Sequence, residues 1–567
     1  MARRWQIAPR THQDIVSQVL ANRGVRDEDV VSFLSPDWDR DVISPWEFTH
    51  MRQAVDVLFA SLERGDKIVI HGDYDADGVS GSSLLFLALQ EVTAKLGMPF
   101  VVEVFLPDRE QDGYGVAMHT IERIAAEGAK LLVTVDCGIA AGLELDRAHE
   151  LGMRGIVCDH HQLGAHLPTH AVLLHPLAPG ETYANKTLCG TGVAFKFANA
   201  IIDEARRRGA DLPEGHEKWY LDLVAIATVT DVMPLKGENR ALESFGLKVL
   251  NKTRRPGLRA ILETSGTELG DIDTQAIGFR IGPRLNAAGR LASAHIAFKA
   301  ITAPTHEEAL VAAAELERLN RERQRIFAEA YAEARVIAAE QARGASVLVV
   351  HAEHWLPGIV GLIAGRLVGD FGLPAFALTK VGEHFVGSGR TAAGLHLVEA
   401  MNACGEVFVK KGGHPQACGL TIISEKHVHQ FREEVNAYAR SVFGDGEVEA
   451  TLEIDAVLDA RLATLHLAER LQTLEPFGEG NRPPVFALPR VTVMAAETMG
   501  ATRSHLRLTV LGQDGGVMKC VGFGMGAKAQ QLPMGSVIDA AVEMGVNVWN
   551  GRREAQLRLV DLGANLC

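Results

Sequence analysis

The stretch "KIVIHGDYDADGVSG", residues 67–81, decides the fold of this chain. Its apolar beginning predicts a buried strand, and three carboxylates, Asp73, Asp75 and Asp77, follow at alternate positions. Like charges at this spacing repel one another unless a positive group lies among them. Gly78 and Gly81 would let backbone and substrate approach closely. The stretch therefore predicts a strand end that binds a positively charged group.

The composition predicts a large cytoplasmic protein. The chain has 567 residues, of which 47% are hydrophobic, so we expect several domains with a sizeable core. No apolar run is long enough to span a bilayer, and the basic N-terminus lacks the apolar stretch of a signal peptide. The seven cysteines are scattered without a C-x-x-C pair, which favours a reducing compartment over disulfides or a zinc site. We therefore expect no membrane partner.

The order of predicted elements divides the first part of the chain into three segments. Residues 1–50 are predicted to form a short helical lead-in. In residues 51–304, apolar strand candidates alternate with helical patterns, which indicates a mostly parallel sheet covered by helices. Residues 305–344 are rich in Ala, Glu, Arg and Leu without an internal Gly or Pro, so they predict one long connecting helix. A coiled coil is the alternative, but the apolar positions do not keep a clean heptad.

The remainder of the chain predicts two further domains. Residues 345–445 repeat the alternation of strands and helices, so we expect a second, smaller α/β domain. Residues 446–567 carry short strand candidates separated by turn signals, which favours a small β-barrel of the OB-fold type. The predicted fold class is therefore α/β: a parallel-sheet domain, a long helix, a smaller α/β domain and a barrel.

Acidic and imidazole side chains follow several of the predicted strands. They are Asp75 and Asp77 after the first strand, Asp136 at the end of "LLVTVD", Asp159, His160 and His161 at the end of "GIVCDHH", and Asp231 after the helical run "AIATVT". Ligands of open α/β sheets bind beyond the carboxyl ends of the strands, so one pocket could collect these groups. Oxygen ligands with a single imidazole suit Mn²⁺ or Mg²⁺ better than zinc. Two such ions about 3.5–4 Å apart would activate water for phosphoryl displacement.

Each of these signals also has an ordinary structural explanation. A single aspartate at a strand end is usually a turn or cap residue. The segment "DYDADG" alone could be a calcium loop, but it follows a strand and lacks the later glutamate of an EF-hand. The joint occurrence of carboxylates and imidazoles at successive strand ends favours a metal site.

The basic residues are distributed unevenly, although the formal net charge of −14 by itself argues against a nucleic-acid partner. Residues 274–300 contain Arg280, Arg284, Arg290 and Lys299 and no acidic residue. Such a local patch can override the overall charge. The alternative is a solvated loop with ordinary surface arginines.

Further candidate contacts for a phosphate backbone lie elsewhere in the chain. Arg109 and Arg390 add positive charge. Tyr114 could stack on a base or pack within a turn. His414 could reach a phosphate or cap a turn.

The motifs carry a family resemblance. "DYDADG", "VTVDCGI", "CDHH" and "TVTDVMPL" resemble the four motifs of the DHH phosphoesterase superfamily, and "GSGRT" and "KGGHPQACGLTI" resemble its DHH-associated domain. "PDREQDGYGV", "IGFRIGPRLNAAGRL" and "EPFGEGNRPPVF" are more specific and resemble the RecJ family of single-stranded-DNA exonucleases. The likeness runs from about residue 50 to the end, in the same order. Some bacterial relatives carry a further C-terminal domain, which we do not expect here.

The resemblance implies roles for individual residues. It implies that two divalent ions, Mn²⁺ or Mg²⁺, are held by Asp75, Asp77, Asp136, His160 and Asp231, with Asp136 as the bridge and His71 as a weaker sixth ligand. It implies that Asp73 and Asp159 support the ligands, and that His161 contacts the scissile phosphate. The substrate-binding residues that it implies are Arg109, Tyr114, Arg280, Arg284, Asn286, Ser388, Arg390 and His414.

The resemblance also implies an activity. We expect a 5′-to-3′ exonuclease that degrades single-stranded DNA to mononucleotides in recombination and repair, as a monomer assisted by a single-strand-binding protein and a helicase. One alternative is an enzyme of the DHH superfamily that acts on small substrates, but the long helix and barrel count against it. The other is a catalytically inactive DNA-binding scaffold, but all five expected ligands are present.

Overall fold

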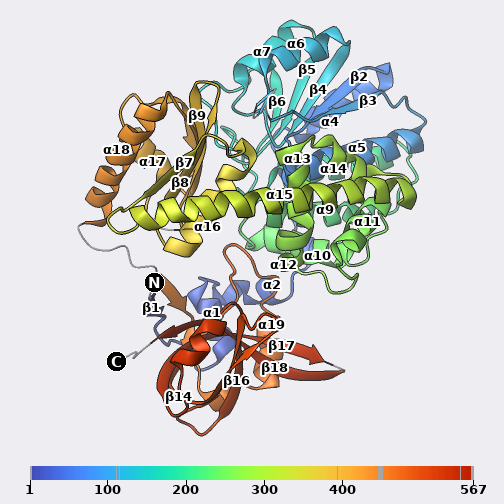
Figure 1. Cartoon of the computed structure of the whole chain (residues 1–567). Coiled ribbons are helices and arrows are strands. Elements are labelled where there is room, and N and C mark those ends of the chain that lie inside the picture. Colours follow the sequence, from blue (N-terminus) through green and yellow to red (C-terminus); the bar gives the residue numbers. More distant parts are fainter. Residues whose placement is uncertain are drawn as a thin grey trace. The chain divides into compact units, whose positions relative to one another are not determined.

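The computed structural model describes residues 3–109, 112–113, 115–392, 394–444, 451–549 and 551–563 (Figure 1). The chain divides into two compact units. The first unit consists of Val19–Asn320 together with Arg470–Pro483, and the second unit consists of the remaining residues. Among the described helices, none is both long and apolar enough to cross a membrane.

A five-stranded parallel sheet forms the centre of the first unit. Its strand order is β3-β2-β4-β5-β6, and all four pairings are parallel, as the sequence predicted. The chain moves outward from β2 to β3 and then returns across β2 to β4, so the strand order reverses between β2 and β4. Open parallel sheets bind ligands at such a reversal. The strands are β2 (Lys67–His71), β3 (Val102–Phe105), β4 (Ala129–Val135), β5 (Arg154–Cys158) and β6 (Ala171–Leu174).

Helices cover both faces of this sheet, because alternate residues of each strand point to opposite sides. Ile68 and Ile70 pack with the helices α4, α5 and α8, whereas Val69 packs with α6 and α7. The covering helices are α4 (Met51–Arg64), α5 (Ala76–Leu96), α6 (Met118–Ala126), α7 (Gly142–Glu150) and α8 (Gly190–Arg207). The shorter helices before them are α1 (Ile15–Asn22), α2 (Val30–Leu34) and α3 (Trp38–Asp41).

A helical layer follows the sheet in the sequence. Its helices are α9 (Leu221–Thr230), α10 (Gly237–Leu250), α11 (Pro256–Ser265), α12 (Thr274–Ala276), a single π-helical turn (Ile277–Ile281), α13 (Gly282–Leu291) and α14 (His295–Thr302). Single π-helical turns inside helices occur often at functional sites.

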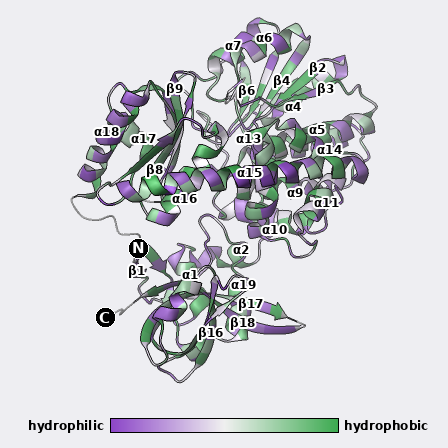
Figure 2. Ribbon diagram, viewed as in Figure 1, coloured by the Kyte–Doolittle hydropathy of each residue, from purple (hydrophilic) through white to green (hydrophobic). Residues whose placement is uncertain are grey.

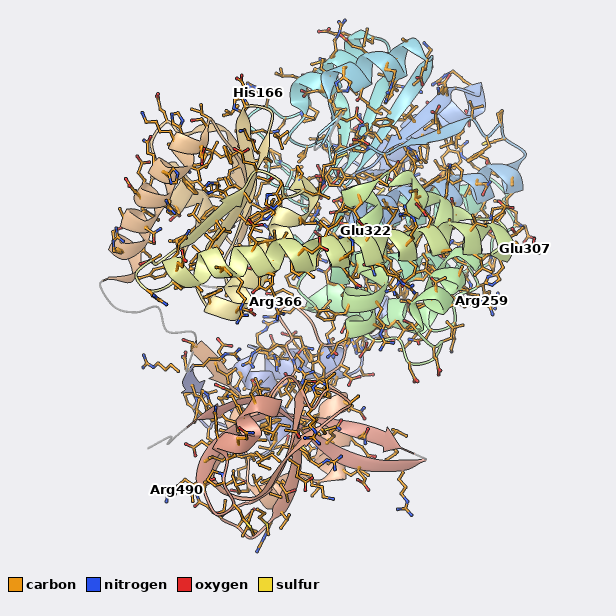
Figure 3. All side chains as sticks on the ribbon, in the orientation of Figure 1. His166, Arg259, Glu307, Glu322, Arg366 and Arg490 are labelled. Atoms are coloured by element: carbon orange, nitrogen blue, oxygen red, sulfur yellow. The ribbon has the colours of Figure 1, made fainter. Side chains whose placement is uncertain are left out.

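One long helix, α15 (His306–Gln341), runs from the first unit into the second, as the sequence predicted (Figure 1). Its first half packs into the core of the first unit through Ala309 and Leu316, and its second half packs into the second unit through Ala334. Glu307, in the part of α15 that belongs to the first unit, and Glu322, in the part that belongs to the second unit, are both labelled in Figure 3.

The second unit contains a mixed five-stranded sheet of order β10-β11-β9-β8-β7, in which only β7 and β8 are parallel. The helices α15 and α16 cover one face, and α17 and α18 cover the other. Figure 2 shows the alternation of hydrophobic and hydrophilic residues along α18 that this packing requires. The elements are β7 (Leu348–Ala352), β8 (Ala375–Val381), β9 (His384–Arg390), β10 (Phe408–Gly413), β11 (Ala417–Ile422), α16 (Val360–Phe371), α17 (Leu397–Asn402) and α18 (Glu425–Phe443).

The C-terminal strands form a closed barrel, as predicted. Five strands follow one another in the order β14-β15-β16-β18-β17, and a pairing between β14 and β17 closes the ring. The strands are β14 (Val485–Met499), β15 (His505–Leu511), β16 (Val517–Gly522), β17 (Val537–Trp549) and β18 (Arg552–Gly563), with β13 (Ala456–Val457) beside β14 and α19 (Leu465–Gln472) between β13 and β14.

Two features differ from the expected segments. Residues 4–7, expected in a helical lead-in, form the strand β1 (Arg4–Ile7), which pairs with β12 (Thr451–Ile454) in the second unit. Trp5 donates a further hydrogen bond from its Nε1 to Asp561 Oδ2 at 3.1 Å. Arg470–Pro483, expected in the barrel domain, belongs to the first unit. Both segments take their place from partners that are distant in the sequence.

Candidate metal centre

The turn between β2 and α5 positions the carboxylates of Asp73, Asp75 and Asp77. Asp75 caps α5: its Oδ1 accepts hydrogen bonds from the backbone N–H groups of Asp77 at 2.9 Å and Gly78 at 3.1 Å. The N–H of Ala76 is bound by Asn286 Oδ1 at 2.8 Å. A Cβ on Gly78 would lie 2.6 Å from the backbone nitrogen of Asp73, so only glycine fits this tight turn. The quoted stretch therefore encodes one rigid turn.

The beginning of α8 fixes Asp77. Its two carboxylate oxygens accept the N–H groups of Gly190 at 2.8 Å and Thr191 at 2.7 Å. Free N–H groups and the helix dipole make such a helix start a binding site for an anion. Sequence reasoning did not assign this role to Thr191. The signal was present, since "CGTG" at residues 189–192 places two glycines at a helix start.

Asp136 lies at the centre of the carboxylates. It follows β4 with a φ of 61°, a left-handed conformation that non-glycine residues seldom adopt. A Cβ on Gly190 would lie 2.5 Å from Asp136 Oδ1, so the glycine makes room for this side chain. Its Oδ1 is buried without a hydrogen-bond partner and lies 3.2 Å from His160 Nε2. Strain of this kind at a buried polar residue is typical of functional sites.

The segment after β5 orients two imidazoles. Asp159 Oδ1 accepts hydrogen bonds from the N–H groups of His160 at 2.7 Å and His161 at 3.2 Å, and it lies 2.8 Å from His161 Nδ1. Its other oxygen binds the N–H of Ile139 at 2.9 Å. His175 adds a support that the sequence did not reveal, because its Nε2 lies 2.9 Å from the carbonyl oxygen of His161. Asp159 thus holds both histidines in place, as a carboxylate behind metal ligands does.

Two sets of ligand atoms converge beside this segment. In each set the candidate ligand atoms lie within 4.8 Å of one another. One set consists of Asp77, His160 and Asp231, and the other consists of Asp73, Asp75 and Asp136. Asp136 also groups with His160 and His161, so it connects the two sets. All of these residues belong to the first unit.

The cluster holds more negative charge than the protein around it neutralises. Among the described residues, no lysine or arginine forms an ion pair with its carboxylates. Burial, together with the neighbouring aspartates, raises the pKa values of Asp73, Asp75, Asp136 and Asp231. Buried atoms without hydrogen-bond partners remain on Asp73, Asp136, His160 and Asp231. A divalent cation with a preference for oxygen ligands would satisfy these atoms and offset the repulsion. The donor set therefore fits Mn²⁺ or Mg²⁺.

The two histidines differ in their electrostatics. Burial and the nearby His161 lower the pKa of His160 to about 4, so its imidazole is neutral and able to ligate a cation. Burial by itself would lower the pKa of His161, but the hydrogen bond with Asp159 raises that pKa to about 9. His161 therefore carries a positive charge at neutral pH, which suits contact with a phosphate.

His71 lies apart from the two ligand sets. It is fully buried at the end of β2, with its Nδ1 3.6 Å from Cys137 Sγ and its ring 4.9 Å from that of Phe105. Burial lowers its pKa to about 4, and its Nε2 has no hydrogen-bond partner. Its role as a sixth ligand stays a prediction.

The two predicted phosphate-binding arginines of the basic segment differ: one is exposed and the other forms an ion pair. Arg280, on the π-helical turn, is exposed. Arg284 Nε forms an ion pair with Glu317 Oε2 at 2.7 Å, and its Nη1 donates to the carbonyl oxygen of Arg280 at 2.6 Å. Arg284 therefore stabilises the helix that presents Arg280, and its own contact with a phosphate is the weaker of the two predictions.

The small residues after Arg284 have a packing role that the sequence reasoning did not foresee. A Cβ on Gly289 would lie 2.3 Å from the carbonyl oxygen of Tyr74. The motif "LNAAGR" thus packs against "DYDADG" through this glycine and through the Asn286 cap. Arg109 stacks on Tyr74, with its guanidinium carbon 4.4 Å from the ring centroid. Tyr114, the predicted stacking residue, lies outside the described residues.

The predicted substrate residues of the second unit lie on β9 and on the β10–β11 connection. Arg390 Nη1 donates to the carbonyl oxygen of Gly389 at 2.7 Å and lies 3.3 Å from Ser388 Oγ. Burial lowers the pKa of Arg390, and no carboxylate among the described residues pairs with it. A Cβ on Gly361 would lie 3.1 Å from Arg390 Nη2, so the guanidinium lies against the first turn of α16. His414 is exposed after β10.

Comparison with known proteins gives three matching domains, described as the DHH family N-terminal domain (residues 67–228), the DHHA1 domain (residues 344–441) and the RecJ OB domain (residues 454–561). The chain is 34% identical to the single-stranded-DNA-specific exonuclease RecJ of Bacillus subtilis, over 96% of this chain and 67% of that protein. It is 32% identical to the RecJ exonuclease of Dickeya dadantii, over 90% of each chain.

Solved structures agree with these matches. The crystal structure of RecJ from Thermus thermophilus in complex with Mn²⁺ has a TM-score of 0.82 and 28% identity, and the match covers 100% of this chain and 80% of that one. The same enzyme in complex with Mg²⁺ has a TM-score of 0.75 and 27% identity, with 100% and 79% covered. The two α/β domains and the barrel are thus shared features, and the chain belongs to the RecJ family of single-stranded-DNA-specific exonucleases.

Proposed function

We propose that this chain hydrolyses single-stranded DNA from its 5′ end and releases mononucleotides, in DNA recombination and repair. The observation that carries the proposal is the buried cluster of carboxylates and His160 at the strand-order reversal, with atoms that lack partners. Family membership supplies the substrate class, since the related enzymes are described as single-stranded-DNA-specific exonucleases.

The residues of the cluster would hold two divalent cations, Mn²⁺ or Mg²⁺. The candidate ligands are Asp75, Asp77, Asp136, His160 and Asp231, and Asp73 joins them, because its carboxylate shares a ligand set with Asp75 and Asp136. Such ions supply a water that is acidic enough to lose its proton near neutral pH, and positive charge for the transition state. Asp159 would keep His161 protonated, so that the imidazolium could contact the scissile phosphate.

Each unit has arginines that are candidates for binding the phosphates of single-stranded DNA. Arg280 offers an exposed guanidinium, which can bind two phosphate oxygens at once. In the second unit, the Arg390 guanidinium lies beside Ser388 and the start of α16, and no carboxylate among the described residues pairs with it. Helix starts and arginines both bind phosphate. Arg109 and His414 remain candidates for further phosphate contacts.

The cellular setting is part of the proposal. The enzyme would act in the cytoplasm as a monomer, on strands that a helicase opens and a single-strand-binding protein covers.

Product analysis on defined substrates tests the function. We expect Mn²⁺-dependent release of mononucleotides from a 5′-phosphorylated single strand and from a 5′ overhang, and no digestion of a blunt duplex or in EDTA. Equal digestion of a 3′ overhang would contradict the polarity. A preference for dinucleotides over long strands would favour the small-substrate alternative, and DNA binding without hydrolysis would favour the scaffold.

A further inference from the structure

A strained residue follows the candidate ligand Asp231. The helix α9 ends in a Schellman arrangement: the N–H of Met233 donates to the carbonyl oxygen of Thr228 at 3.0 Å, and that of Val232 donates to Val229 at 3.2 Å. Val232 has a φ of 56°, in the left-handed region that glycine normally occupies at this position. A β-branched residue is an outlier there, and such strain persists only where the surroundings restrain the chain.

A restraint lies three residues further on. The N–H of Leu235 donates to the carbonyl oxygen of Glu479 at 2.8 Å. The Leu235 side chain is 1% exposed, and a Cβ on Gly478 would lie 2.7 Å from its Cδ1. The partner residues belong to 474–481, "LEPFGEGN", which we call the strap. The strap thus holds the end of the loop that begins at Asp231.

The strap is itself firmly built. Gly478 and Asn481 exchange two backbone hydrogen bonds, at 2.9 and 3.1 Å. The fully buried Asn481 donates from Nδ2 to the carbonyl oxygens of Leu474 and Pro476, each at 2.8 Å. Arg240, also buried, donates to the carbonyl oxygens of Glu475 at 2.7 Å and Pro476 at 3.2 Å. The buried hydrogen bonds from Asn481 and Arg240 to these backbone carbonyl oxygens hold the strap in one conformation, although Asn481 Oδ1 has no partner.

The same strap holds the segment that carries Arg280. Thr274 begins α12, directly before the π-helical turn, and its Oγ1 donates to the carbonyl oxygen of Phe477 at 2.6 Å. Gly282, which directly follows the π-helical turn, also packs on α9, because a Cβ on it would lie 2.4 Å from Thr230 Cγ2. The strap therefore binds two elements that come from separate parts of the first unit.

We infer that the strap is a positioning element of the reaction centre: it holds the Asp231 loop in its strained conformation and fixes the Arg280 segment relative to it. The inference rests on the proposed function, which assigns cation binding to Asp231 and phosphate binding to Arg280. The strap reaches the first unit from the C-terminal part of the chain, between α19 and β14. Part of what shapes the metal centre is thus encoded beside the barrel.

Three substitutions in the full-length chain separate the two connections. Asn481→Ala removes the two side-chain hydrogen bonds that fold the strap and loosens both connections. Thr274→Val removes only the bond to the Arg280 segment. Gly478→Ala crowds Leu235 and disturbs only the Asp231 loop. Thr264→Val is the matched control, because its Oγ1 donates to carbonyl oxygens of its own helix α11, at 3.0 Å to Ala260.

Hydrogen exchange of the metal-free protein measures directly how firmly the strap holds the Asp231 loop and the Arg280 segment. We expect Asn481→Ala to speed exchange in residues 228–236 and 274–285, and to weaken Mn²⁺ binding in calorimetry, by about tenfold each. Thr274→Val should speed exchange only in residues 274–285 and weaken binding of single-stranded DNA in EDTA. Gly478→Ala should affect only residues 228–236 and Mn²⁺ binding. The control should match the wild type in all three measurements.

Two results would show whether the inference about the strap or the proposed function is wrong. If the strap variants exchange faster only within residues 474–481 and bind Mn²⁺ and DNA normally, the strap merely packs and the inference fails. If Asp231→Asn leaves Mn²⁺ binding unchanged, the proposed function fails instead. Should Asn481→Ala not fold, Gly478→Ala and Thr274→Val decide the two connections separately.

Discussion

The parallel sheet of the first unit and the mixed sheet of the second unit both carry predicted site residues, but they leave charge of opposite sign unpaired. The parallel sheet gathers carboxylates whose pKa values are raised and whose oxygens lack partners. The mixed sheet presents Arg390, whose pKa is lowered by burial and which no carboxylate among the described residues neutralises. A cation suits the first sheet and a phosphate suits the second.

The topology of each sheet explains this difference. Parallel strands bring all their carboxyl ends to one edge, so residues that follow β2, β4 and β5 meet. In the mixed sheet, β9 runs antiparallel to both of its neighbours, and its last residues lie against the start of α16 instead. We therefore expect substitutions in the first sheet to abolish chemistry, and those in the second to weaken the hold on the strand.

The largest effect should follow Asp136→Ala. Asp136 connects both ligand sets, so its loss should lower kcat by roughly a thousandfold or more while the fold is kept. Asp211→Ala, on the exposed surface of the same unit, is the control. Steady-state hydrolysis of a labelled single strand with Mn²⁺, together with circular dichroism, makes the measurement. Turnover near that of the wild type would remove the two-cation assignment.

Arg280→Ala and Arg390→Ala should have intermediate effects of different kinds. We expect each to impair cleavage by about ten- to a hundredfold, as the loss of a charged hydrogen bond does. If Arg280 holds the terminal phosphate, its variant should also lose the preference for 5′-phosphorylated over 5′-hydroxyl strands, whereas Arg390→Ala should mainly raise KM.

Kinetics on the two substrates at two salt concentrations separate these outcomes. A merely electrostatic surface arginine gives a modest, salt-dependent weakening for both substrates alike. Arg366→Ala is the control, since Arg366 lies on α16, the helix beside Arg390, and forms an exposed ion pair with Asp370 at 3.3 Å. An unchanged phosphate preference with wild-type kcat would exclude Arg280 from the site.

Local patterns in the sequence carried most of the fold. Strand periodicity predicted the parallel sheet and the barrel, and composition predicted α15, because these signals lie within each element. The strand β1 was missed because its partner β12 lies more than 400 residues away. The strap was missed for the same reason: nothing in "LEPFGEGN" indicates that its partners are Leu235 and Thr274.

The candidate site could be predicted as a set of residues but not as a set of roles. Strand ends and motifs named the carboxylates and histidines. The ion pair of Arg284 with Glu317, and the cap that Asn286 provides for α5, depend on long-range contacts that a single sequence does not show. The same holds for Asp73: the resemblance implied that it supports the ligands, and its carboxylate groups with those of Asp75 and Asp136, so its role as support or ligand stays a prediction.

Asp159→Asn should shift the pH dependence of cleavage with a smaller effect on its maximum. The Asp159 carboxylate raises the pKa of His161 to about 9, so without it the imidazolium would lose its proton at lower pH. We expect the alkaline limb of the kcat profile to move down by at least one pH unit, while the value near pH 6 changes little. His175→Gln is the comparison, because His175 supports His161 only through the backbone carbonyl oxygen of His161. An unmoved alkaline limb would show that His161 is not the titrating group.

The smallest effect concerns stability, and it tests the excess negative charge itself. Burial and the neighbouring Asp75 raise the pKa of Asp73, so the folded metal-free protein binds more protons than the unfolded chain does. The stability that Asp73 contributes is therefore fully present below its pKa in the unfolded chain. It is lost as the pH rises through its pKa in the folded protein. Asp73→Asn should leave stability unchanged near pH 4 and raise it near pH 8 by roughly 1–3 kcal/mol.

Urea unfolding in EDTA at several pH values makes this measurement, and Asp66→Asn is a control of opposite sign. The Arg64 guanidinium lowers the pKa of Asp66, so that contribution is present above the unfolded pKa and is lost as pH falls. Asp66→Asn should therefore destabilise at neutral pH and not near pH 3. Saturating Mn²⁺ should reverse the sign for Asp73, because the wild-type carboxylate then faces a cation. If Asp73→Asn leaves the stability of the metal-free protein unchanged at every pH, the carboxylates of the first sheet carry no uncompensated negative charge.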